Sequence, residues 1–173
     1  ALATILSKQG KDNQCAFVLR RLIRDHPDFA PAYVDLAQLH LRNDRVDDAM
    51  GVLSAGLKRR PRDTVLLNDL GMVRLMQGQN QQAYDRFQQA ASAAPWDARY
   101  RGNTALALGL TGRYEESFAL YEQIVSSRDA HYNLWVIAQA RGDEDRARQE
   151  LEAYRRESTA AQPAEKMPQS MPS

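Results

Sequence analysis

The feature that most constrains this chain is an interval of 34 residues that recurs in two sets of turn-forming residues. One set consists of prolines: Pro27, Pro61 and Pro95. The other set follows the same interval: Gly10, Asp44, Gly78 and Gly112. Proline cannot continue a helix, and glycine accepts the left-handed backbone at which helices often end. The spacing therefore predicts a series of helical hairpins.

The repeat from 64 to 97 shows the pattern within one hairpin. Leu67, Leu70 and Arg74 lie at i, i+3 and i+7, on one face of a first helix. Ala83 and Phe87 lie at i and i+4 on a second helix. A single hairpin cannot bury its apolar face alone, so neighbouring hairpins are expected to stack against it.

This register divides the chain into a helical solenoid and a tail. The solenoid is expected over residues 1–157, as a partial repeat at 1–29 and repeats at 30–63, 64–97, 98–127 and 128–157. Residues 158–173 contain three prolines and no apolar period, so they are predicted to be a disordered tail. We thus expect an all-α fold of about four to five helix pairs, without strands.

The fourth repeat departs from the pattern. Asp129 stands where a proline is expected, and Gly142 follows Gly112 by only 30 residues, which indicates a shortened connection. Trp135 then falls at the position of a small residue, Gly71 or Ala105. Either the indole fills an altered packing gap, or the register shifts locally. The sequence leaves both readings open.

Composition excludes several classes of function. The formal net charge is +1, and the basic clusters fall at the ends of second helices, which argues against nucleic-acid binding. The chain has no apolar run long enough to span a membrane, and Cys15 has no second cysteine to pair with. It begins without methionine, apparently inside a helix, so we expect a segment upstream and give little weight to the missing signal peptide.

No catalytic or metal-binding constellation is visible. The histidines His26, His40 and His131 belong to different repeats, and neither a His-x-x-x-His motif nor paired cysteines occur. Acidic pairs such as Glu115–Glu116 open second helices, where they complement the helix dipole. We therefore expect no enzyme activity, no cofactor and no metal.

The spacing, with leucine, glycine, alanine, phenylalanine and proline in place, resembles the tetratricopeptide repeat family over roughly residues 1–157. The resemblance implies a right-handed superhelix of helix pairs that binds a protein or peptide partner in its concave groove. The alternatives are a self-assembling structural module and a cytosolic co-chaperone or regulatory adaptor.

A narrower resemblance concerns the segment 97–117, which begins with Asp97-Ala-Arg-Tyr-Arg-Gly-Asn103. This segment is similar to repeats of the lipoproteins encoded with tight-adherence (Flp) pilus machinery. The resemblance implies a pilotin-like role in pilus or secretion-system assembly, with an outer-membrane secretin or pilus component as partner. It also implies a periplasmic location at the outer membrane, with membrane attachment only through an upstream lipid anchor; the alternative location is cytoplasmic.

In such a fold the first helix of each pair lines the groove. The sixth position of successive repeats holds Asp35, Asp69 and Asn103, followed by Asn133 in the last repeat. An amide can both donate to and accept from an extended peptide backbone, and asparagines at this position do so in the family. Ionised aspartates can only accept, so they favour a peptide N–H or a basic residue.

Neighbouring groove positions are apolar. Met72, Leu75, Met76, Leu106 and Leu110 would form a contiguous patch, and exposed patches of this kind mark interfaces. Packing in the core and self-association remain alternatives for this patch. The predicted partner-binding residues are Asn68, Met72, Leu75, Met76, Arg99, Asn103, Leu106, Leu110, Asn133 and Val136, with Arg99 as a candidate anchor for a carboxylate.

Overall fold

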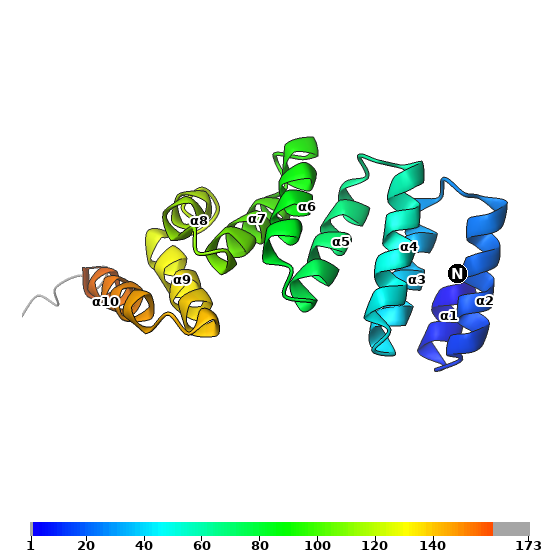
Figure 1. Ribbon diagram of the computed structural model, residues 1–173, viewed down its shortest axis with the longest axis horizontal. Coiled ribbons are helices and arrows are strands. Elements are labelled where there is room, and N and C mark those ends of the chain that lie inside the picture. Colours follow the sequence, from blue (N-terminus) through cyan, green and yellow to red (C-terminus); the bar gives the residue numbers. More distant parts are fainter. Residues whose placement is uncertain (1, 161–173) are drawn as a thin grey trace, which may run out of the picture.

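The computed structural model describes residues 2–160, which form ten helices and no strand (Figure 1). The fold is a right-handed α-solenoid of five helix pairs, which confirms the expected all-α class. The helices are α1 (Leu2–Lys8), α2 (Asp12–Asp25), α3 (Ala30–Arg42), α4 (Val46–Arg59), α5 (Thr64–Met76), α6 (Asn80–Ala93), α7 (Ala98–Leu110), α8 (Tyr114–Tyr121), α9 (Ser127–Arg141) and α10 (Glu144–Ala160).

The pairs stack along the long axis of the molecule, from α1–α2 at one end to α9–α10 at the other (Figure 1). Each helix packs against the next one in the chain, as in α5 against α6 and α6 against α7. In addition, α3 contacts α5 and α7 contacts α9. The first helices of neighbouring pairs thus contact one another in these two places, and we call the layer of odd-numbered helices the inner layer.

The turns within the pairs follow the 34-residue interval. Gly10, Gly78 and Gly112 have φ angles of +68°, +70° and +88°, and Asp44 takes the same conformation at +56°. Asp44 is the only non-glycine residue with positive φ among residues 2–160. Aspartate tolerates this region better than most residues, which explains why it can replace glycine in the repeat.

The core lies between the two helices of each pair and between pairs. Phe87 on α6 is fully buried, and its ring packs directly against Gly71 on α5. A Cβ atom at Gly71 would lie 2.5 Å from Cε1 of Phe87. Glycine at this position thus sets the distance between α5 and α6.

The fourth pair differs in its second helix. Helix α8 has 8 residues, whereas α4 and α6 have 14 each. The shortening expected in the connection therefore falls within the helix, and residues 122–126 form turns before α9. Ser126 caps α9, and its side chain accepts a hydrogen bond from the Asp129 backbone N–H.

Helix α9 nevertheless keeps the register of the earlier repeats. Its buried residues Ala130, Leu134 and Ile137 are offset by one constant interval from Leu66, Leu70 and Val73 on α5. Trp135 is half-buried and packs against the core of the last pair. The structure thus favours repacking around the indole over a shift of register.

Helix α10 ends at Ala160, three residues beyond the expected end of the solenoid at 157. Hydroxyl groups support this last turn, since Ser158 Oγ donates to the Tyr154 carbonyl at 2.8 Å and Thr159 Oγ1 donates to the Arg155 carbonyl at 3.0 Å. The remainder of the predicted tail, 161–173, lies outside the described residues. Among the helices that are described, none has the length and apolar character needed to cross a membrane.

Candidate binding groove

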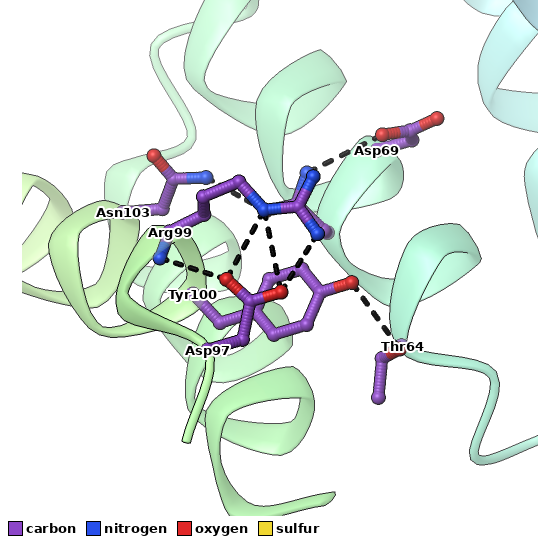
Figure 2. Close-up of polar contacts among 7 residues, drawn as sticks. Thr64, Asp69, Asp97, Arg99, Tyr100 and Asn103 are labelled. Atoms are coloured by element: carbon purple, nitrogen blue, oxygen red, sulfur yellow. Dashed lines mark hydrogen bonds and ion pairs between the residues drawn. The ribbon is translucent and has the colours of Figure 1, made fainter. Parts of the chain in front are cut away.

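Two of the predicted asparagines contact each other across the inner layer. Asn103 Nδ2 on α7 donates a hydrogen bond to Asn68 Oδ1 on α5 at 2.7 Å. Asn68 Nδ2 in turn donates to Asp69 Oδ1 at 3.3 Å. We call Asn103, Asn68 and Asp69 the amide ladder; Figure 2 labels the two residues at its ends, Asn103 and Asp69.

A second link joins the same two helices. Tyr100 on α7 is buried, and its hydroxyl hydrogen bonds to Thr64 Oγ1 at the start of α5 at 3.2 Å (Figure 2). Thr64 and Tyr100 were absent from the sequence-based site. Together with the ladder, this contact joins α5 and α7 through side-chain hydrogen bonds.

The electrostatic environment of Asp69 is unfavourable to its charge. Burial raises the pKa of the Asp69 carboxyl above its ordinary value, and the nearby charge of Asp63 acts in the same direction. The hydrogen bond from Asn68 opposes this rise in pKa. The ladder therefore ends in a partly desolvated carboxylate.

The predicted apolar residues divide into two groups. Met72 and Met76 on α5 are exposed, with 41% and 60% of their surface accessible. Leu75 is half-buried against the core around Phe87, and Leu106 and Leu110 are half-buried against the core of the last two pairs. The three leucines thus serve mainly as packing residues.

Val65 extends the exposed group, although the sequence-based site omitted it. It precedes Met72 by two turns on the same face of α5 and is 45% exposed. The signal was available, because Val65 occupies the second position of its repeat. We call Val65, Met72 and Met76 the α5 stripe.

Arg99 is already engaged within the chain. Its Nη2 atom lies 2.7 Å from Asp97 Oδ2, its Nε atom donates to Asp97 Oδ1 at 3.1 Å, and its guanidinium lies over the Tyr100 ring (Figure 2). The hydrogen bonds from Arg99 lower the pKa of the Asp97 carboxyl. A ligand carboxylate would have to displace Asp97, so the predicted role of Arg99 as a free anchor is not favoured by this geometry.

The last two predicted residues lie on α9, apart from the ladder. Asn133 is half-buried, and Val136 is 45% exposed. Next to Asn133, Tyr132 packs against Tyr154 of α10, with ring centroids 5.7 Å apart. The structure therefore joins Asn68 to Asn103, places Met72 and Met76 on the same helix as Asn68, and leaves Asn133 and Val136 on α9.

Two family models described as tetratricopeptide repeat match consecutive parts of the chain, residues 1–68 and 68–130. The chain belongs to the tetratricopeptide repeat family. The matched parts include the ladder and the α5 stripe, so both features lie on family repeats. No curated protein matches this tetratricopeptide repeat chain significantly.

Several solved structures share the fold. A crystal structure of MamA superposes with a TM-score of 0.69 at 15% identity, covering 92% of this chain and 96% of that one. MamA from Desulfovibrio magneticus RS-1 gives 0.69 at 17% identity, covering 94% of each chain. YrrB, described as a TPR protein with an unusual peptide-binding site, gives 0.68 at 18% identity, covering 88% of this chain and 80% of its own.

Proposed function

We propose that this chain is a non-catalytic scaffold that binds an extended segment of a partner protein along the inner face of α5 and α7. The observation that carries the proposal is the position of the α5 stripe on the same helix as Asn68 and Asp69 of the amide ladder. Apolar side chains exposed to water along one helix face are typical of an interface. Amides beside them supply the groups that an extended backbone needs.

The geometry suits shallow, extended recognition. Methionine side chains are flexible and polarizable, so Met72 and Met76 can adapt to different apolar side chains. Asn68 and Asn103 are held by each other at 2.7 Å, which orients both amides before a ligand arrives. The fold similarity to YrrB, a protein described as having a peptide-binding site, is consistent with such a role.

Selection from a displayed library of random peptides tests this function. The wild-type chain should select apolar peptides, and the double variant Met72→Asp, Met76→Asp should lose their binding. Val125→Asp is the control, because Val125 is 37% exposed between α8 and α9, away from the α5 stripe and from the first hairpin. Equal binding by the wild type and the double variant would contradict the proposal.

A finer proposal concerns the biological setting. The similarity of residues 97–117 to repeats of tight-adherence pilus lipoproteins supports a partner in pilus or secretion-system assembly, at the periplasmic side of the outer membrane. Fractionation of the native cells, followed by crosslinking at Met76, would examine this setting. Recovery of the chain in the cytosolic fraction, or crosslinking to unrelated cytosolic proteins, would contradict it.

Self-assembly is the second candidate, favoured by apolar side chains on the first hairpin. Leu2, Ile5 and Phe17 are 57%, 53% and 67% exposed. Light scattering over a range of concentrations separates the two functions. Self-assembly predicts a molar mass that rises with concentration and falls back in Phe17→Asp, whereas a monomer at every concentration removes this candidate.

A further inference from the structure

Asp69 is a carboxylate without a cation. Within residues 2–160 it takes part in no ion pair, and its one hydrogen-bond donor is the neutral amide of Asn68 at 3.3 Å. Other carboxylates on or next to α5 and α7 are paired, such as Asp97 with Arg99 and Asp63 with Arg60. The Asp69 carboxylate, at one end of the ladder, therefore lacks a compensating positive charge within these residues.

We propose that the bound segment carries a lysine or arginine beside its apolar residues, and that Asp69 binds this basic side chain. The proposal rests on the function proposed above and adds the chemistry of the partner to it. The apolar residues of the segment would lie on Met72 and Met76, and the cation would complete the ladder at Asp69.

The neighbouring basic residues do not meet this need. The guanidinium of Arg99 is held by Asp97 through Nη2 and Nε, in a fork that satisfies both groups. Arg42, on the inner helix α3, donates to Ser7 Oγ at 2.8 Å. Within residues 2–160 no basic side chain forms an ion pair with Asp69, so a cation supplied by the bound segment would be its first ionic partner there.

The environment of Asp69 also favours a cation over a neutral hydrogen-bond donor as the partner of its carboxylate. Burial and the charge of Asp63 both raise the pKa of Asp69, which means that the ionised form lacks stabilisation in the free protein. A positive charge at hydrogen-bond distance from the carboxylate supplies that stabilisation, and a peptide N–H supplies less of it. Differential stabilisation of this kind is a source of specificity.

A second carboxylate continues the same pattern along the inner layer. Asp35 on α3 occupies the repeat position equivalent to Asp69, and it is exposed without an ion-pair partner in the described part of the chain. It lines a small cavity of about 150 Å³ together with Gln38 and Arg42. At the sixth position of the repeat, α3 and α5 thus carry the carboxylates of Asp35 and Asp69, whereas α7 carries the amide of Asn103.

Charge complementarity also separates this partner from an acidic one. An acidic segment would bring its carboxylates towards Asp69 and Asp35, and Arg99 could pair with it only by leaving Asp97. A basic segment meets Asp69, which forms no ion pair within residues 2–160, and Asp35, which is exposed beside Arg42. The charge pattern therefore favours a segment in which apolar and basic residues are close in sequence.

Peptide selection with Asp69→Asn tests the proposal, because asparagine keeps the shape and the hydrogen bond from Asn68 while removing the charge. Peptides selected by the wild type should be enriched in lysine and arginine next to apolar residues. Asp69→Asn should bind these peptides about tenfold more weakly. The charge reversal Asp69→Lys should shift the selection towards acidic peptides. Asp85→Asn, at an exposed carboxylate on the second helix α6, is the matched control and should bind as the wild type does.

The possible results separate the two proposals. Selected peptides without basic enrichment, or equal affinity of the wild type and Asp69→Asn, would overturn the assignment of Asp69 and leave groove binding intact. Failure of the wild type to select any peptide would overturn both. Circular dichroism and urea unfolding of Asp69→Asn would establish that any loss of binding occurs in a folded chain.

Discussion

Asn103 and Asn68 lie in adjacent repeats, and a hydrogen bond of 2.7 Å joins their side chains across α7 and α5. This contact places two predicted ligand-binding amides in one unit rather than in two independent positions. It also means that substitution of either residue affects both the groove and the packing of adjacent repeats. Experiments on the groove therefore have to separate stability from binding.

A double-mutant cycle measures this contact. Asn68→Ala and Asn103→Ala should each destabilise the fold, and their effects should not add, with a coupling energy of about 0.5–1.5 kcal/mol. Urea unfolding followed by circular dichroism gives the four free energies. A coupling energy of zero would mean that the hydrogen bond does not contribute to the stability of the solenoid.

Close approach of α5 and α6 gives a second prediction. Gly71→Ala should cost about 1–3 kcal/mol in the free energy of unfolding, because the new Cβ atom would lie 2.5 Å from Phe87 Cε1. The control is Gly51→Ala on α4, where no atom lies within 4 Å of the added Cβ. That variant should gain about 0.5–1 kcal/mol, since alanine is the better helix former. Equal effects of the two substitutions would refute this account of the pair.

We expect the stability of the fold to depend on pH through His40, the buried histidine of α3. Burial lowers the pKa of His40 below its ordinary value, and the neighbouring charge of Arg45 contributes to the shift. The unfolded chain then binds a proton below about pH 6.5 that the folded chain does not bind, so folding loses stability as the pH falls towards the folded pKa.

His40→Leu removes this contribution, and leucine occurs at the equivalent position as Leu108. Between pH 7.5 and pH 5, the wild type should lose more free energy of unfolding than the variant does, and the difference should be confined to the range below about pH 6.5. Parallel pH profiles for the two proteins would contradict the prediction.

The last pair depends on a buried carboxylate. Glu150 on α10 is 4% exposed, and its oxygens lie 2.6 Å from His131 Nδ1 and 2.7 Å from Arg146 Nε. Glu150→Ala should cost about 2–3 kcal/mol, less than for a fully buried pair, because His131 and Arg146 retain some exposure. Glu152→Ala, at an exposed position on the same helix, should change stability by about 0.5 kcal/mol or less. A similar cost for both variants, measured by thermal unfolding, would exclude a specific role for Glu150.

The repeat interval was sufficient to predict the fold because it specifies both turn chemistry and helix pairing. Gly78 and Asp44 take the left-handed conformation that the spacing required, and Gly71 lies against Phe87 where the two helices of its pair approach. The shortening of α8 could not be located from the sequence, since a deletion leaves the same spacing wherever it falls. Helix α9 keeps the register of the earlier repeats in spite of Trp135. Its packing is determined by the buried residues Ala130, Leu134 and Ile137, whereas the indole is only half-buried.

The site was predicted less completely than the fold. Periodicity identified the inner face, so Met72, Met76, Asn68 and Asn103 were found together. Periodicity does not report how tightly each position packs, and Leu75, Leu106 and Leu110 proved to be half-buried. The engagement of Arg99 by Asp97 depends on the capping geometry at the start of α7, which the repeat pattern does not encode.

Nuclear magnetic resonance of the methionine methyl groups tests groove binding most directly. Met72 and Met76 are exposed on the α5 stripe, whereas Met50 is half-buried on α4 and serves as an internal reference. On titration with a selected peptide, the methyl signals of Met72 and Met76 should shift in proportion to binding, and that of Met50 should stay in place. A peptide that binds with equal affinity and leaves the Met72 and Met76 signals unchanged would contradict the account.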